Sequence, residues 1–306
     1  MVQVALCQMG SVGTPEENMA EMERLFLQAV ENSRAELDLI VFPEYCYYTP
    51  VDKDDARRIA IDVSRPHPFI DRMKELAREY HVNLIPGSFA AVAKDGKVSN
   101  HSIMLNREGE EIGFYDKIHL FDAAGYKESS YVEAGSRLCL VDFDFGKVGF
   151  EVCYDLRFPE QARTMVLQGA DIIVVSSEFP AGQPLPPRTN DWDLLVRSCA
   201  LTNLTYVAVC NQFGAVHDDH PFGMSMVVDP RGIAVSSAQG RNCVVYGEID
   251  LEYARTTKKN LAVWENRRPD VYELEIAEAG TYYLGGDINN NYFFRVIERI
   301  MVIFLE

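Results

Sequence analysis

Short apolar runs that alternate with helical patterns constrain the fold of this chain more than any other feature. Runs such as "LDLIVFPE" (37–44) and "ADIIVVSS" (170–177) have the length and β-branched content of buried strands. Helical stretches between such runs lie near residues 67–80, 159–169 and 189–203. Strands alternating with helices predict an α/β fold with one extended core.

The composition narrows the possible partners. The chain has 306 residues, with 46 acidic and 29 basic side chains and a net charge of -17. This charge repels phosphate backbones and anionic lipid, so neither nucleic acid nor membrane is an expected partner. No apolar run reaches the roughly 18 residues that a membrane helix needs.

The cysteines and the N-terminus favour a cytoplasmic location. The seven cysteines are scattered, without CxxC or His-linked spacing, so we expect neither a disulfide scaffold nor a metal site. The opening "MVQVALCQMG" lacks the basic region of a secretion signal and is typical of a first strand.

Three reactive side chains stand where apolar runs end: Glu44 in "VFPEYC", Lys117 in "FYDKIHLFD" and Cys153 in "GFEVCYD". Functional groups of α/β sheets collect at such strand ends. Taken singly, each has a plainer interpretation. Glu44 suits a helix cap, Lys117 a solvated surface charge, and Cys153 a small buried hydrophobe.

Taken together, a carboxylate, an ammonium and a thiol are the parts of a nucleophilic acyl-transfer site. A free thiol is mostly protonated at neutral pH, so Glu44 is expected to accept the proton of Cys153 during attack. Lys117 and the backbone N–H of Tyr154 are then placed to stabilise the oxyanion that forms.

The ordered segments "FPEY", "YDKIHLFD" and "VCYDLRFPE" resemble the nitrilase superfamily of carbon–nitrogen hydrolases, and the resemblance runs from the first strand to "RRPDVY" near residue 272. It implies a four-layer α-β-β-α sandwich, a Glu44–Lys117–Cys153 triad and subunits that pair through helices beside the active site. It also implies that Glu128 orients the substrate and the lysine. No cofactor is implied.

Within the superfamily the chain is similar to the amidase branch of ω-amidases and amidases of deaminated glutathione. The resemblance implies a small-molecule amide as substrate, a thioester on Cys153 and a homodimer or larger homo-oligomer. The same triad also serves hydrolysis of N-carbamoyl amines or nitriles. A catalytically silent scaffold is the alternative from another class.

Several positions depart from the pattern of that branch. Glu151 stands two residues before the nucleophile, where strand alternation places both on one face, and we expect an ion pair with Arg157 or Arg163. Met224 stands where relatives often carry histidine. The charged residues Asp155, Arg157 and Glu160 are expected to brace the turn after Cys153.

Two segments bear on the pocket and on the domain boundaries. The proline-rich loop after residue 177 predicts that Glu178, Phe179 and Arg188 line the pocket. A composition shift divides a hydrolase domain, 1–274, from an extension, 275–306, with a Gly/Asn-rich joint and an apolar end. We expect this extension to pack on the body or on a partner subunit, with a frayed terminus as the alternative.

Overall fold

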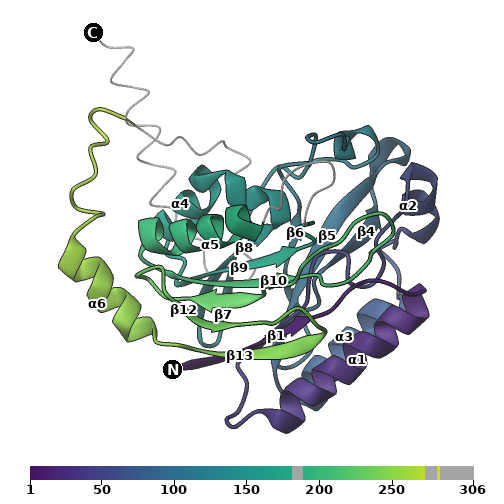
Figure 1. The fold of residues 1–306 in the computed structure, drawn as a ribbon, viewed down its shortest axis with the longest axis horizontal. Helices are drawn as coiled ribbons and strands as arrows, with labels where there is room; N and C mark the ends of the chain where they lie inside the picture. The colour runs from purple at the N-terminus through teal and green to yellow at the C-terminus, as the bar shows by residue number, and fades with distance from the viewer. Residues whose placement is uncertain (181–188, 273–280, 283–306) are drawn as a thin grey trace.

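The computed structural model describes residues 1–180, 189–272 and 281–282, and in them two sheets stack face to face (Figure 1). The first sheet has the order β13-β1-β2-β3-β5-β4, with β6 paired to β5. The second has the order β12-β11-β10-β9-β8-β7-β14. Parallel pairs such as β8–β9 and β9–β10 lie at the centre of the second sheet, with antiparallel pairs beside them.

The bounds of the elements are as follows. The strands of the first sheet are β1 (Val2–Gln8), β2 (Leu39–Val41), β3 (Asn83–Ile85), β4 (Ser88–Val92), β5 (Val98–Leu105), β6 (Glu111–Asp116) and β13 (Cys243–Ile249). Those of the second are β7 (Leu138–Phe143), β8 (Gly146–Val152), β9 (Ile172–Ser177), β10 (Tyr206–Asn211), β11 (Met226–Val228), β12 (Ala234–Ser237) and β14 (Thr281–Tyr282). The helices are α1 (Pro15–Asn32), α2 (Lys53–Ile59), α3 (Pro68–Glu79), α4 (Pro159–Leu167), α5 (Thr189–Asn203) and α6 (Leu251–Leu261), with short 3₁₀ turns η1 (Lys94–Gly96), η2 (Glu128–Ser130) and η3 (Cys153–Arg157).

Side-chain alternation along β1 shows how the layers are held together. Val4 and Leu6 belong to the apolar cluster that joins the two sheets. Ala5 and Cys7 belong to a second cluster, which contains residues of α1 and α3. Because successive strand residues point to opposite faces, one strand can serve both layers.

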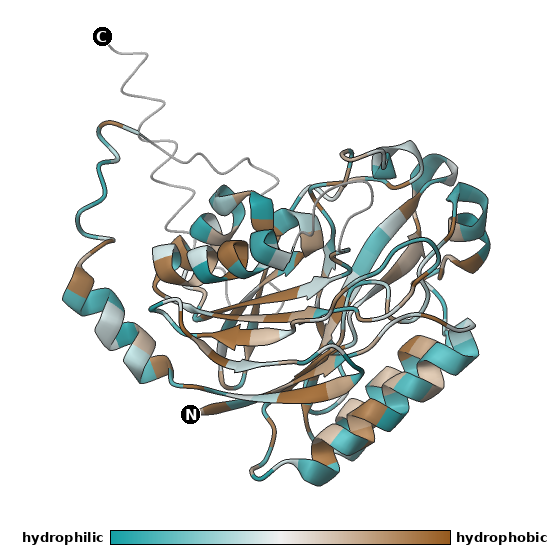
Figure 2. Cartoon of the chain, in the orientation of Figure 1, coloured by the Kyte–Doolittle hydropathy of each residue, from teal (hydrophilic) through white to brown (hydrophobic). Residues whose placement is uncertain are grey.

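The outer layers are helical. Helices α1 and α3 cover the first sheet, while α4 and α5 cover the second (Figure 1). Helix α1 begins with a capping box formed by Thr14 and Glu17. In Figure 2 apolar residues concentrate along the strands, whereas the outer helices carry many hydrophilic ones. The α-β-β-α sandwich is therefore confirmed.

Two further predictions concern the C-terminal extension and membrane-spanning helices. Of the 275–306 extension, only Thr281–Tyr282 is described, as strand β14 in parallel pairing with Leu138 and Cys139 of β7; the rest, like Arg188, lies outside the described residues. Among the helices within 1–180 and 189–272, none is long and apolar enough to span a bilayer.

Candidate active site

Seven of the eight residues singled out in the sequence for catalysis or substrate contact lie around one cavity of about 560 Å³, and the eighth, Arg188, lies outside the described residues. They are Glu44, Lys117, Glu128, Cys153, Tyr154, Glu178 and Phe179. Glu44 follows β2, Lys117 follows β6 and Cys153 follows β8, so strand ends of both sheets supply the reactive groups. A cavity of this volume suits a small molecule.

Glu44 is a buried carboxylate held from three sides. Its Oε1 accepts hydrogen bonds from Lys117 Nζ at 3.0 Å and from Asn100 Nδ2 at 2.8 Å. Its Oε2 accepts one from the backbone N–H of Glu178 at 2.8 Å. With 3 % of its surface exposed, Glu44 has a fixed orientation, and the alternative that it caps a helix is wrong.

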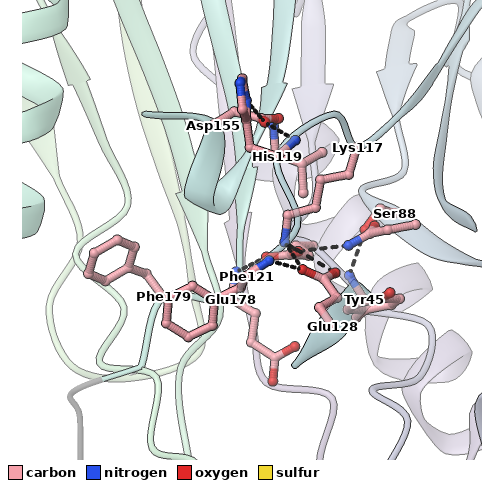
Figure 3. Close-up of polar contacts among 12 residues, drawn as sticks. Tyr45, Ser88, Lys117, His119, Phe121, Glu128, Asp155, Glu178 and Phe179 are labelled. Carbon is pink, nitrogen blue, oxygen red and sulfur yellow. Dashed lines mark hydrogen bonds and ion pairs between the residues drawn. The ribbon is translucent and has the colours of Figure 1, made fainter. Parts of the chain in front are cut away.

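Lys117 lies between two carboxylates, as Figure 3 shows for Glu128. Its Nζ is 3.0 Å from Glu44 Oε1 and 3.0 Å from Glu128 Oε2. Burial alone would lower the pKa of Lys117, but the charges of Glu128 and Glu44 outweigh burial and hold this pKa well above its ordinary value. Lys117 is thus a buried cation and not a solvated surface charge, and Glu128 Oε2 also accepts from Phe121 N at 2.6 Å.

Cys153 occupies a strained turn directly after β8. Its φ of 48° lies in the left-handed region, which is uncommon for a residue with a side chain and recurs at functional turns. Burial raises the pKa of its thiol well above the ordinary value, the charge of Glu44 raises it further, and the charge of Lys117 opposes both. The resting thiol is therefore protonated, and a base must take its proton for attack.

Asp155 supports this turn through hydrogen bonds. It is fully buried, and its two oxygens accept hydrogen bonds from Val152 N (2.8 Å), the Tyr115 hydroxyl (2.7 Å) and His119 N (3.1 Å). His119 Nδ1 also lies 2.8 Å from Asp155 Oδ1 (Figure 3). The carboxylate thereby ties β8 to the segment after Lys117.

The expectation for Glu151 is wrong on both points. Strand alternation ends at Val152 because Cys153 turns out of the strand, so Glu151 does not line the cavity. Glu151 instead faces the α4–α5 layer, since a Cβ on Gly149, on the same face of β8, would meet Met165 of α4. Arg157 pairs with Asp191, and Arg163 donates to Thr202 O.

Burial without a partner sets the protonation state of Glu151. Neither carboxyl oxygen has a hydrogen-bond partner within the described part of the chain. Burial raises its pKa well above the ordinary value, and the charge of Asp155 adds to this effect. Burial therefore favours the neutral form of Glu151 in the folded protein.

The remaining charged residues of the turn, and Met224, lie outside the cavity lining. Glu160 is exposed in the first turn of α4, so Asp155 is the one of the three predicted bracing residues that holds the turn itself. Met224 also has a left-handed φ, 58°, and its carbonyl accepts from Trp192 Nε1 at 2.9 Å.

Sequence reasoning missed two amides that support Glu44. Asn100 of β5 donates to its carboxylate, and Gln212 donates to its backbone carbonyl at 2.7 Å. Asn100 is fully buried, although it stands in a row of four polar residues of β5, Ser99 to Ser102. A row of polar residues does not predict burial, so no signal in the sequence pointed to this contact.

Comparison with known proteins agrees with this geometry. The family model described as "Carbon-nitrogen hydrolase" matches residues 3–259, and the chain belongs to that family. The ω-amidase NIT3 of Saccharomyces cerevisiae is 31 % identical over 89 % of this chain and 94 % of its own. The 2-oxoglutaramate amidase of Bacillus subtilis is 30 % identical over 86 % and 95 %.

Solved structures show the same fold. Saccharomyces cerevisiae Nit3, described as a member of branch 10 of the nitrilase superfamily, aligns with a TM-score of 0.79 at 28 % identity, covering 87 % of this chain and 96 % of its own. The NitFhit protein of Caenorhabditis elegans aligns with a TM-score of 0.82 at 26 % identity, covering 94 % and 68 %. The protein is thus an enzyme of the carbon–nitrogen hydrolase class.

Proposed function

We propose that the protein is a thiol amidase that cleaves the C–N bond of a small linear amide. The observation that carries the proposal is the buried Glu44–Lys117–Glu128 ion group, whose charges act on the Cys153 thiol inside a small-molecule cavity. The names of the relatives, amidases among them, support the same class of reaction.

The first half of the reaction forms a thioester. Glu44 takes the proton of Cys153 as the sulfur attacks the amide carbon, and the C=O electron pair moves onto oxygen. Lys117 and the N–H of Tyr154, in the first turn of η3 where helical N–H groups lack partners, stabilise that oxyanion. Glu44 then returns the proton to the nitrogen, the C–N bond breaks and ammonia leaves.

The second half releases the acid. Water replaces ammonia in the cavity, and Glu44 removes a proton from it as its oxygen attacks the thioester carbon. The C–S bond breaks, the carboxylic acid leaves, and the sulfur regains a proton. Glu128 holds Lys117 and Phe121 N in place through both halves, which makes it a positioning residue. Side chains and backbone supply every group in this scheme, so we propose no cofactor.

The test is ammonia release from a panel of small amides, with Cys153→Ala beside the parent and Cys199→Ala as a thiol control outside the cavity. Release by the parent and by Cys199→Ala, lost in Cys153→Ala, would support the proposal. N-carbamoyl amine and nitrile versions of one scaffold belong in the same panel. Turnover of those alone would reassign the reaction, and no thioester or turnover at all would favour a silent scaffold.

The cellular setting is also a proposal. We propose a cytoplasmic homodimer or larger homo-oligomer, in which residues 275–306 pack on the body or on a partner. All seven cysteines are free, which suits a reducing compartment, and the pairing of β14 with β7 supports packing on the body. Light scattering of the full chain and of a 1–274 truncation would test the assembly.

A further inference from the structure

The charge of the cavity wall bears on the substrate. Among the described lining residues, six are acidic and two are lysines. Lys117 is already bound to Glu44 and Glu128. Lys127 is the one other lysine of the described lining. The four remaining acids of the lining are Asp52, Glu178, Asp218 and Asp219. An anionic substrate would meet repulsion here, whereas a cation would be attracted.

Glu178 is the acid of this group nearest to the catalytic residues. Its backbone N–H binds Glu44, while its own Oε2 accepts one hydrogen bond, from Thr49 Oγ1 at 3.1 Å. No lysine or arginine of the described residues forms an ion pair with it at 4.0 Å or less. Burial and the charges of Glu44 and Asp219 raise its pKa well above the ordinary value. A cation bound beside this carboxyl group would oppose both effects and favour its charged form.

Aromatic rings form much of the remaining wall. Those that line the cavity are Tyr45, Phe121, Tyr126, Tyr131, Tyr154 and Phe179. Ring faces attract organic cations and give an anion no such attraction. The rings of Phe121 and Tyr154 meet edge to face, with centroids 5.0 Å apart, which fixes this part of the wall.

One buried polar group beside this wall has no partner among the described residues. The hydroxyl of Tyr45 is buried and has no hydrogen-bond partner among the residues that the structure describes. Tyr45 is 6 % exposed and lines the cavity. A buried polar group of this kind is costly unless something pairs with it. This oxygen is not accessible from the cavity, so Tyr45 contributes its ring to the wall and no hydrogen bond to a ligand.

From the acidic lining, the aromatic wall and the Glu178 carboxyl, which forms no ion pair among the described residues, we infer that the cavity selects amides whose distal end carries an ammonium group, bound by Glu178. This inference rests on the proposed amidase reaction and names its substrate class. It separates the chain from its relative named as an amidase of 2-oxoglutaramate, which is an anion.

Three primary amides of similar length test the class, because each releases ammonia: 4-aminobutanamide (cationic), pentanamide (its neutral isostere) and succinamate (anionic). A charge-assisted hydrogen bond predicts kcat/KM about tenfold higher for 4-aminobutanamide than for pentanamide. Succinamate should be the poorest of the three. Equal or higher kcat/KM for succinamate would overturn the inference.

Variants of Glu178 test the residue through ratios, which cancel a general loss of activity. Glu178→Gln should bring the ratio of kcat/KM for 4-aminobutanamide over pentanamide to about one, and Glu178→Lys should make succinamate the preferred charged substrate. Glu31→Gln, an exposed change at the end of α1, is the matched control and should leave the parental ratio.

The outcomes separate the two levels of the proposal. No ammonia from any of the three amides, or release that survives Cys153→Ala, would contradict the amidase reaction itself. Release that depends on Cys153 but shows no cationic preference would contradict this inference alone. An unchanged ratio in Glu178→Gln would mean that Glu178 acts as a neutral hydrogen-bonding group, and would remove it as the ammonium site.

Discussion

The active-site cavity and the face of β8 covered by α4 and α5 hold buried carboxyl groups in opposite ways. At the cavity end, Glu44 and Glu128 share the cation Lys117 and have hydrogen bonds besides. On the face covered by α4 and α5, Glu151 has neither a cation nor a hydrogen bond among the described residues. The first arrangement keeps charge available for chemistry, and the second keeps an acid neutral. Four variants can break or sharpen this contrast.

The largest effect is expected from Lys117→Met, which removes the shared cation. Two carboxylates would remain buried without compensation, and breaking such a group costs about 3–5 kcal/mol in the free energy of unfolding. Activity should fall below detection, because the oxyanion loses its charged partner. Denaturant unfolding and ammonia release measure the two effects.

The matched control is Lys127→Met, which removes an exposed lysine of the cavity rim. Its effect on the free energy of unfolding should stay within about 0.5 kcal/mol. A Lys117→Met variant as stable as this control would show that the two carboxylates do not need the cation.

Glu44→Gln should cost activity far more than stability. The amide can keep the hydrogen bond from Glu178 N, but it cannot take the proton of Cys153, so kcat should fall by about 10²–10⁴-fold. Steady-state ammonia release measures kcat. A variant that retained the parental kcat would exclude Glu44 as the base.

Asp155→Asn probes the support behind the nucleophile. Four donor groups surround the carboxylate, and an amide would turn its NH₂ toward one or two of them. We expect a loss of about 1–3 kcal/mol in the free energy of unfolding with a smaller loss of kcat than in Glu44→Gln. Asp142→Asn, exposed on β7, is the control. Equal stability of the two variants would contradict the bracing role.

The strand ends and their reactive residues could be predicted from the sequence because they depend on local patterns. The order of Glu44, Lys117 and Cys153 along the chain then identified the family. The contacts of Lys117 with Glu44 and Glu128 join residues 73 and 11 positions apart, and no periodicity predicts such contacts. The expectation that these residues lie together came from the resemblance to the superfamily.

Other parts failed for identifiable physical reasons. The face of Glu151 was predicted wrongly because alternation stops where Cys153 adopts a left-handed backbone. Helix α6 was missed because it buries only Ala254 and Thr257.

The smallest expected effect has the opposite sign. Glu151→Met, which replaces the unpaired acid by an apolar side chain of similar size, should raise the free energy of unfolding at pH 7 by about 1 kcal/mol. In the parent, the pKa of Glu151 is raised on folding, so the folded state binds a proton that the unfolded state releases. The contribution of Glu151 to the free energy of unfolding is therefore largest below the ordinary glutamate pKa of the unfolded chain. It is lost as the pH rises toward the higher pKa of the folded state.

The advantage of Glu151→Met should accordingly vanish near pH 4 and grow from pH 5 to pH 7, because both states hold the parental proton at the lower pH. Denaturant unfolding across this range, with Glu248→Met on the exposed side of β13 as control, measures the difference. A loss of stability that is the same at every pH would mean that Glu151 is paired and charged, and the contrast between the cavity and the helix-covered face of β8 would disappear.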